Sequence, residues 1–250
     1  MTPPTTALSQ LSPAKFGGVR KLPEPRRASA SLADIILGGQ DGLVNTLGVI
    51  LGVAAASSDP RLVIAAGLAA TFAESISMGA VAYTSTLADH DHYRVELERE
   101  QREIREMPRA EEQEVRAIFS SWGFAGDLLE RAVAQIIKSE VTWVEVMMRN
   151  ELKLAPIEAS NALRIALVVG VSALIGSLVP LLPFLLLPIG AAVPTALACS
   201  ALVLFGVGAY KARLTVGLPW RSGLQMAVIG LVSALAGYLV GALFQAPVTP

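Results

Sequence analysis

Five long apolar segments constrain the fold of this chain more than any other feature. They occupy residues 33–57, 62–87, 162–182, 184–210 and 223–244, and each is 21 to 27 residues long. A helix of about 20 apolar residues crosses the hydrocarbon core of a bilayer. Only 16% of the residues are charged, against about 25% in an ordinary soluble domain. We therefore predict an all-α membrane protein with five transmembrane helices.

The boundary between the third and fourth segments carries three prolines, Pro180, Pro183 and Pro188. A proline inside a helix removes a backbone hydrogen bond and clashes with the preceding turn. We therefore expect a tight turn across these prolines, separating two spans, rather than one long helix.

Composition divides the chain into four parts. Residues 1–32 are rich in Pro, Ser and basic residues and lack the apolar core of a signal peptide, which predicts a flexible basic arm in the cytosol. Residues 33–88 hold the first two spans, and residues 162–246 hold the last three. Residues 89–161 form an insert with 16 acidic and 10 basic residues, a net charge of −6, which we expect to be a helical domain outside the bilayer.

The short loops predict the orientation of the spans. The loop between the fourth and fifth spans carries Lys211, Arg213 and Arg221. The turn between the first and second spans and the turn between the third and fourth spans together carry only Arg61. Because short cytosolic loops are enriched in Lys and Arg, we expect the N-terminus and the insert to be cytosolic and the C-terminus to lie outside.

The first span is rich in glycine. Gly38 with Gly42, and Gly48 with Gly52, form small-xxx-small pairs. Such pairs let helix backbones approach closely in lipid, so the simplest interpretation is a packed helix interface.

The same span also carries three polar residues on one face. Asp41 follows Asp34 by seven residues, and Asn45 lies one further turn along. Asp34 fits either a position at the headgroups or a polar pathway. Asp41 lies about 10 Å deeper at 1.5 Å per residue, too deep for a short side chain to reach interfacial water. We therefore expect it to line a polar pathway.

The second span has a carboxylate, Glu74, near its midpoint, at a cost of about 2.5 to 3.5 kcal/mol on insertion scales. Thr71, Ser75 and Met78 lie on the same stripe of the helix. A single methionine usually fills a core. Met78, beside Glu74 and facing Asp41 on the neighbouring helix, becomes a candidate metal ligand. A carboxylate together with a thioether suits Fe²⁺ and its first-row neighbours better than Mg²⁺ or Ca²⁺.

The insert reads as short helices. Residues 89–107 should continue the second span out of the membrane, Pro108 should interrupt this helix, and a restarted helix should end at Gly123. Residues 126–138 and 140–152 are amphipathic, with a modest apolar face. We expect a marginal independent core that bound metal would help to stabilise.

Carboxylates and thioethers recur in the insert at helical spacing. Five glutamates and two methionines are candidate metal ligands: Glu100, Glu103, Glu111, Glu114, Met147, Met148 and Glu151. The alternative for each glutamate is a solvated salt bridge, and the nearby arginines are Arg99, Arg102, Arg105 and Arg116. We expect Met147 and Met148 to lie on an otherwise polar surface, which favours metal ligands over the salt-bridge alternative. A ferritin-like di-iron site would need Glu-x-x-His, and neither His90 nor His92 has a glutamate three residues before it.

From about residue 33 to the end, the chain resembles the vacuolar iron transporter family, which also includes bacterial homologues and nodulin-21-like proteins. The matching stretches are DGLVNTLGVILGVAAAS in the first span, AESISMGA with Tyr83 and Ser85 in the second, the two E-x-x-E pairs from Glu100 to Glu114, and WVEVMMRNELKL before the third.

The resemblance implies a five-span homodimer, associating through its membrane helices, that exports Fe²⁺ and often Mn²⁺ from the cytosol in exchange for protons. It implies that the seven insert residues above bind metal, with Zn²⁺ as a further candidate ion, and that Asp34, Asp41 and Met78 line the pathway. Relatives commonly have Gly-Glu-Tyr after the methionine, where this chain has Ala82 before Tyr83. Glu74 is placed to take over part of that glutamate's role.

Other functional classes have less support from the sequence. There is no Walker A motif or DKTG-like phosphorylation loop for an ATP-driven pump, and no prosthetic group or nucleic acid is expected. A membrane-anchored metal sensor or store would use the insert alone. A ferroxidase enzyme would need histidines that the insert lacks. We expect a multi-pass protein in the plasma membrane if the chain is bacterial, or in the vacuolar membrane if it is eukaryotic.

Overall fold

The computed structural model describes residues 25–57, 59–214 and 217–244. Within these ranges the chain is helical, and no strand is found. In chain order the elements are α1 (Pro25–Ala56), α2 (Pro60–Glu106), α3 (Pro108–Ser121), α4 (Gly126–Ile136), α5 (Glu140–Val146), the π-helical turn η3 (Met147–Glu151), the 3₁₀ turn η4 (Ala159–Asn161), α6 (Ala162–Leu186), α7 (Ile189–Leu214) and α8 (Pro219–Leu243).

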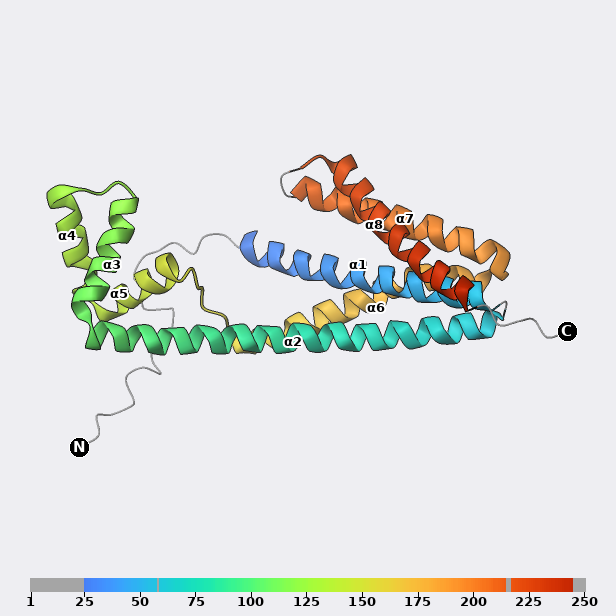
Figure 1. Cartoon of the computed structure of the whole chain (residues 1–250), viewed down its shortest axis with the longest axis horizontal. Coiled ribbons are helices and arrows are strands. Elements are labelled where there is room, and N and C mark those ends of the chain that lie inside the picture. The colour runs from blue at the N-terminus through green and yellow to red at the C-terminus, as the bar shows by residue number, and fades with distance from the viewer. Residues whose placement is uncertain (1–24, 58, 215–216, 245–250) are drawn as a thin grey trace, which may run out of the picture.

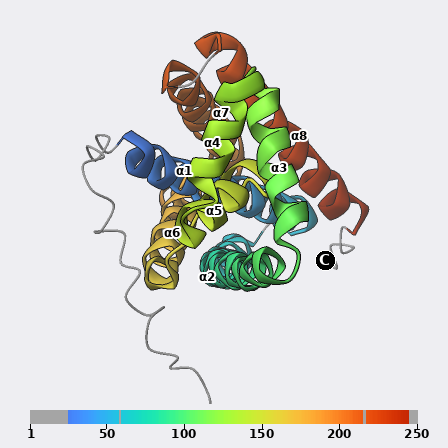
Figure 2. The ribbon, with the colours of Figure 1, turned by 90° about the vertical axis from the view of Figure 1, so that its left-hand side faces the viewer.

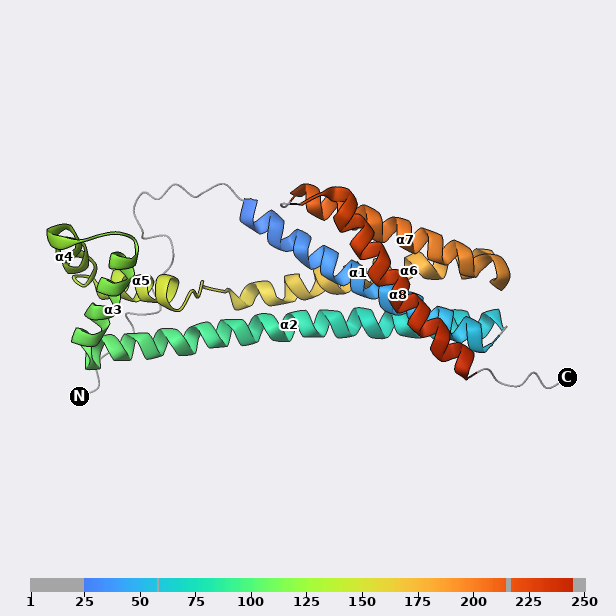
Figure 3. The same cartoon turned by 45° about the horizontal axis from the view of Figure 1, so that its top comes forward.

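Helix α2 runs the full length of the molecule and connects its two parts (Figure 1). Helices α1, α6, α7 and α8 form a bundle against the first part of α2, whereas α3, α4 and α5 lie at its far end. The α7–α8 hairpin lies on the side of α1 that is remote from α2 (Figure 3). Helix α1 is therefore central, with contacts to all four other long helices.

Five helices are long and apolar enough to cross a membrane, as predicted: 32–56, 60–106, 159–186, 189–214 and 219–243. The protein is a multi-pass integral membrane protein by this criterion. Helix α1 already begins at Pro25, within the part of the chain expected to be a basic arm, so its start differs from the predicted boundary at residue 32. The rest of that arm, and the last residues of the predicted fourth part, lie outside the described residues.

The predicted turn across three prolines is also wrong in part. Helix α6 continues through Pro180 and Pro183 and ends only at Leu186. Prolines are tolerated in membrane helices where neighbouring helices support the backbone, and here the adjacent Leu181 and Phe184 are packed in the bundle core. The chain breaks one turn later, where Leu187, which precedes Pro188, takes the extended conformation that a following proline favours.

Backbone chemistry explains the length of α2. The Asp59 carboxylate caps its start by accepting a 2.9 Å hydrogen bond from the backbone N–H of Arg61. The helix ends at Met107 because Pro108 starts α3 in a new direction, as the sequence predicted. One rigid helix therefore extends from the bundle to the base of the insert.

The glycines of α1 are packed against neighbouring helices within the same chain, which confirms the simplest interpretation. A side chain at Gly42 would meet the backbone of Ala173 in α6, and one at Gly52 would lie 2.9 Å from the Gly237 carbonyl oxygen in α8. Glycine is required there because the backbones themselves are in contact.

The insert has a larger core than its sequence suggested. Seven apolar side chains are buried together, namely Ile104, Val115, Val133, Trp143, Val144, Met147 and Met148. Partly buried residues from α2, α3 and α4, including Tyr93, Phe119 and Leu129, surround them. In the view from this end, α3 and α4 stand side by side (Figure 2). The modest apolar face predicted for residues 126–152 is thus one part of a core to which α2 and α3 also contribute.

Candidate functional site

The five candidate glutamates of the insert come from three elements. Glu100 and Glu103 lie near the end of α2, Glu111 and Glu114 lie in the first two turns of α3, and Glu151 lies in η3. The chain turns sharply at Pro108, so that α3 stands across the end of α2 (Figure 1), and η3 contacts both helices. As a result the five carboxyl groups act on one another electrostatically, as their pKa values show below.

Two of these carboxyl groups are buried. Glu100 and Glu111 are each only 4% exposed. Oε1 of Glu100 and Oε2 of Glu111 have no hydrogen-bond partner within the described residues. A buried charge that lacks a partner is strongly disfavoured, so these oxygens are placed to receive a proton or a cation.

The pKa values of three of these groups are raised. Burial first, and then the neighbouring Glu111, raise the pKa of Glu100 to about 8. Burial and the charge of Glu114 raise the pKa of Glu151 to about 7. Burial also raises the pKa of Glu111, although the hydrogen bond donated by protonated Glu100 opposes this shift. The site thus holds protons near neutral pH that a cation would displace.

Salt bridges do not account for this cluster. Glu103 pairs with Arg99 at 3.0 Å, but none of the ion pairs found among the described residues involves the other four glutamates. Two of the four arginines expected to neutralise them bind other glutamates. Arg105 pairs with Glu140, and Arg116 binds Glu112 and Glu130. The salt-bridge alternative therefore holds for Glu103 alone.

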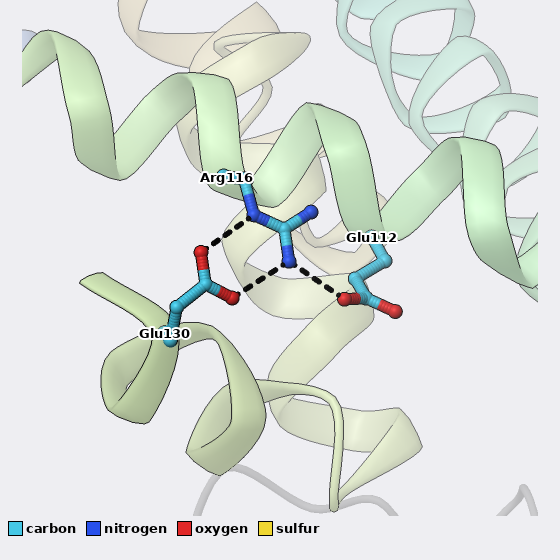
Figure 4. Close-up of polar contacts among 3 residues, drawn as sticks. All are labelled: Glu112, Arg116 and Glu130. Carbon is cyan, nitrogen blue, oxygen red and sulfur yellow. Dashed lines mark hydrogen bonds and ion pairs between the residues drawn. The ribbon is translucent and has the colours of Figure 1, made fainter. Parts of the chain in front are cut away.

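Arg116 connects α3 to α4 (Figure 4). Its Nε and Nη2 donate to the two carboxylate oxygens of Glu130 at 3.1 and 3.0 Å, and Nη2 also donates to Glu112 at 2.9 Å. These bonds lower the pKa of Glu130. The contact of Arg116 with Glu112 has the i, i+4 spacing within α3 and can be predicted from the sequence. The contact with Glu130 cannot, because it depends on how α4 packs against α3.

Met147 and Met148 are fully buried, with exposed fractions of 0% and 2%. The expected polar surface around them is therefore wrong. Both lie in the π-helical turn, in which Leu152 N–H donates to the Met147 carbonyl five residues earlier, and the Asn150 side chain donates to the Val146 carbonyl at 2.9 Å. The wider turn lets two consecutive side chains point into the core.

The arrangement is open rather than a closed cage. Within the described residues no three His, Cys, Asp or Glu side chains form a compact set that could enclose a metal ion. The donor chemistry nonetheless suits a divalent cation, since carboxylate oxygens with raised pKa values face one another and thioethers are buried close by in sequence.

A second polar group lies within the spans. The carboxyl group of Glu74 in α2 interacts with the side chains of Asp41 and Asn45 in α1. Asp41, Glu74 and Met78 are half-buried, whereas Asn45 is exposed. The structure thus brings together Asp41, Asn45 and Glu74, which are three of the five predicted pathway residues.

The other polar residues of these spans lie apart from that group. Asp34 is half-buried two turns before Asp41 on α1. The Thr71 hydroxyl donates to the Gly67 carbonyl at 2.8 Å, and the Ser75 hydroxyl donates to the Gly170 carbonyl of α6 at 2.7 Å. Ser75 therefore faces α6, so the single stripe predicted for α2 is split between two neighbours. The register of α2 against α1 and α6 determines that Glu74 faces α1 and Ser75 faces α6.

The known proteins to which this chain is similar belong to a single family. Residues 32–242 match the model of the VIT family. The protein is 35% identical over 212 residues to vacuolar iron transporter 2 of Oryza sativa subsp. japonica, covering 84% of this chain and 86% of the relative. It is 32% identical over 219 residues to vacuolar iron transporter 1 of Arabidopsis thaliana, covering 87% and 88%. The vacuolar iron transporter of Plasmodium falciparum is 26% identical over 226 residues, covering 86% and 82%.

Proposed function

The chain belongs to the VIT family, and on this premise we propose that it is a membrane transporter that exports divalent iron and manganese from the cytosol in exchange for protons. The observation that carries the proposal is the meeting of Glu74 with Asp41 and Asn45 between two apolar helices. Ionisable groups inside a membrane are costly and mark ion or proton pathways. Neither a sensor nor a store confined to the insert would need them.

The two polar groups have separate roles in this proposal. The five insert glutamates, with Met147 and Met148, gather Fe²⁺ or Mn²⁺ and release protons on binding. Asp34, Asp41, Asn45, Glu74 and Met78 then line the route across the bilayer. Hard carboxylates with a thioether suit first-row divalent ions. Zn²⁺ also accepts carboxylate oxygens and is a further candidate ion for the insert.

The distribution of basic residues supports export from the cytosol. The insert, the start of α1 and the α7–α8 connection all lie at one end of the bundle (Figure 1). That end carries Arg164, Lys211, Arg213 and Arg221, whereas the opposite turn carries Arg61. By the positive-inside rule the insert end faces the cytosol, where its acidic surface meets incoming cations.

A homodimer follows from the same polar face. Asn45 is exposed and Glu74 is only half-buried in a single copy of the chain. In lipid such groups need polar partners or a water-filled cavity. A second copy packed on the α1–α2 face would enclose them and form the walls of the pathway.

The test is metal uptake into proteoliposomes under an imposed pH gradient, comparing Fe²⁺, Mn²⁺ and Zn²⁺. We expect Asp41→Ala to abolish uptake while calorimetry shows unchanged metal binding by the insert. Asp127→Asn, which alters an exposed salt bridge with Arg131 in the insert, is the matched control and should transport normally. Undiminished uptake by Asp41→Ala would overturn the pathway. Metal binding without any uptake by the wild-type protein would instead indicate a sensor or store.

A further inference from the structure

A cluster of basic and aromatic residues lies where α7 connects to α8. We define this hairpin tip by Tyr210, Lys211, Arg213, Trp220 and Arg221. The two helices are held together directly below it, because a side chain at Gly208 of α7 would lie 2.9 Å from the Cα of Gly223 in α8. The hairpin tip lies at the insert end of the bundle (Figure 1). It is therefore at the boundary between the apolar spans and the aqueous phase.

The positive charge of the hairpin tip has no acidic counterpart nearby in the sequence. From residue 159 to residue 250 the chain contains no Asp or Glu. Among the described residues no ion pair involves Arg213 or Arg221. The insert differs, since six of its arginines pair with carboxylates. These are Arg94, Arg99, Arg105, Arg116, Arg131 and Arg149. Arg213 and Arg221 are thus available to an anion from outside the chain.

The aromatic residues of the hairpin tip point to the source of that anion. Tyr210 is 53% exposed and Trp220 is 56% exposed, and they lie at the ends of α7 and α8. Such amphipathic rings are enriched at the level of lipid headgroups. The Arg221 guanidinium lies 5.3 Å from the centre of the Trp220 ring, a cation–π distance that holds the charge at the same level.

We propose that the hairpin tip binds the phosphate of an anionic phospholipid in the leaflet that faces the insert. An arginine guanidinium matches phosphate oxygens in charge and geometry. Basic residues beside an anionic leaflet each strengthen attachment by about fivefold. Loss of Arg213 and Arg221 together should therefore weaken binding by roughly 25-fold. This inference goes beyond the transport function and does not depend on it.

The experiment uses the full chain in nanodiscs of phosphatidylcholine with and without phosphatidylglycerol. Native mass spectrometry counts retained lipids, and thermal unfolding gives Tm. We expect phosphatidylglycerol to be retained and to raise Tm for the wild-type protein. The Arg213→Gln/Arg221→Gln variant should lose both effects. The Arg105→Gln/Arg131→Gln variant removes the same charge from the insert and should keep them.

Three results would overturn the proposal. The first is an equal response of the two double variants. The second is equal stabilisation by phosphatidylcholine and phosphatidylglycerol. The third is full stabilisation by inorganic phosphate alone, which would indicate a free phosphate site. If the tip double variant does not fold, the single variants Arg213→Gln and Arg221→Gln replace it, each with an expected loss of about fivefold.

Discussion

Glu100 of α2 and Glu111 of α3 face each other across the fold of the insert, each 4% exposed, and one carboxyl oxygen of each has no hydrogen-bond partner among the described residues. Evolution of a stable fold alone would favour apolar or paired residues at such positions. The pair is better suited to exchanging protons for a cation, and the insert's stability and metal affinity should then both depend on pH.

The stability of the metal-free protein should fall as pH rises from about 4.5 to about 8. The pKa of Glu100 is raised to about 8 and that of Glu151 to about 7, so the folded state binds more protons than the unfolded state within this window. The stabilisation is complete below the unfolded pKa and is lost as pH rises through the folded values. Thermal unfolding of the purified full chain across this pH range, with a chelator present, measures the slope. The slope should be reduced in Glu100→Gln.

Metal binding near pH 6.5 should release about one to two protons, since Glu100 and Glu151 are then largely protonated and must ionise to bind a cation. Titration calorimetry with Mn²⁺ in two buffers of different ionisation enthalpy counts these protons. The affinity should rise between pH 6 and pH 8. A heat independent of buffer would contradict the participation of these two groups.

Replacement of Glu111 and Glu114 together by glutamine should weaken metal binding by at least about tenfold, because loss of even an outer-shell partner typically costs 10- to 100-fold. The fold should survive, since the change removes negative charges that repel one another. Glu112→Gln is the control on the same helix, where Glu112 faces Arg116 instead. Titration calorimetry measures the affinity, and an unchanged dissociation constant in the double variant would rule out these residues as ligands.

Substitution can separate the packing of Met147 and Met148 in the insert core from their proposed role as metal ligands. Leucine at either position conserves volume and should cost less than about 1.5 kcal/mol of stability, whereas Met147→Ala should cost about 2 to 5 kcal/mol because the residue is fully buried. If the sulfurs bind metal, the leucine variants lose affinity for Fe²⁺ or Zn²⁺ without losing stability. Denaturant unfolding and calorimetry on the same samples distinguish packing from ligation.

Local features of the fold could be predicted from the sequence because they depend on local chemistry. Five apolar segments became five helices, and Pro108 ended α2. The i, i+3 spacing of Glu100 with Glu103 placed two carboxylates on one face of a helix, and the sharp turn at Pro108 then brought Glu111 of α3 to that face.

Features that depend on tertiary packing could not be predicted. Pro180 and Pro183 read as a turn, yet neighbouring helices support α6 through them. The methionines read as surface residues because nothing in the sequence revealed a π-helical turn. The contact of Glu74 with Asn45 depends on the register between α1 and α2, which helical periodicity within one segment does not determine.

Gly241→Ala should destabilise the bundle, because its new methyl group would lie on the carbonyl of Gly52 in α1 and the backbones of α1 and α8 would have to separate. Gly206→Ala is the matched control: it lies inside α7 with no atom near the added methyl group. It should be neutral or stabilising by up to about 1 kcal/mol, since alanine favours helix. Thermal unfolding in one detergent compares them, and equal Tm values would show that the α1–α8 contact can relax.

Lys153→Gly should stabilise the insert by about 1 kcal/mol. Lys153 follows the π-helical turn with φ of 56°, a left-handed conformation that costs a residue with a Cβ about 1 to 2 kcal/mol. Leu154 N–H then donates to the Met148 carbonyl at 2.8 Å, so the conformation closes the end of the turn that carries the two methionines. Glycine adopts it freely, although its more flexible unfolded chain offsets part of the gain. Lys153→Ala loses the same side chain but keeps the Cβ, and it should give no gain. Chemical denaturation of the three proteins tests this, and equal stabilisation by glycine and alanine would show that the lysine side chain, rather than its backbone conformation, is unfavourable.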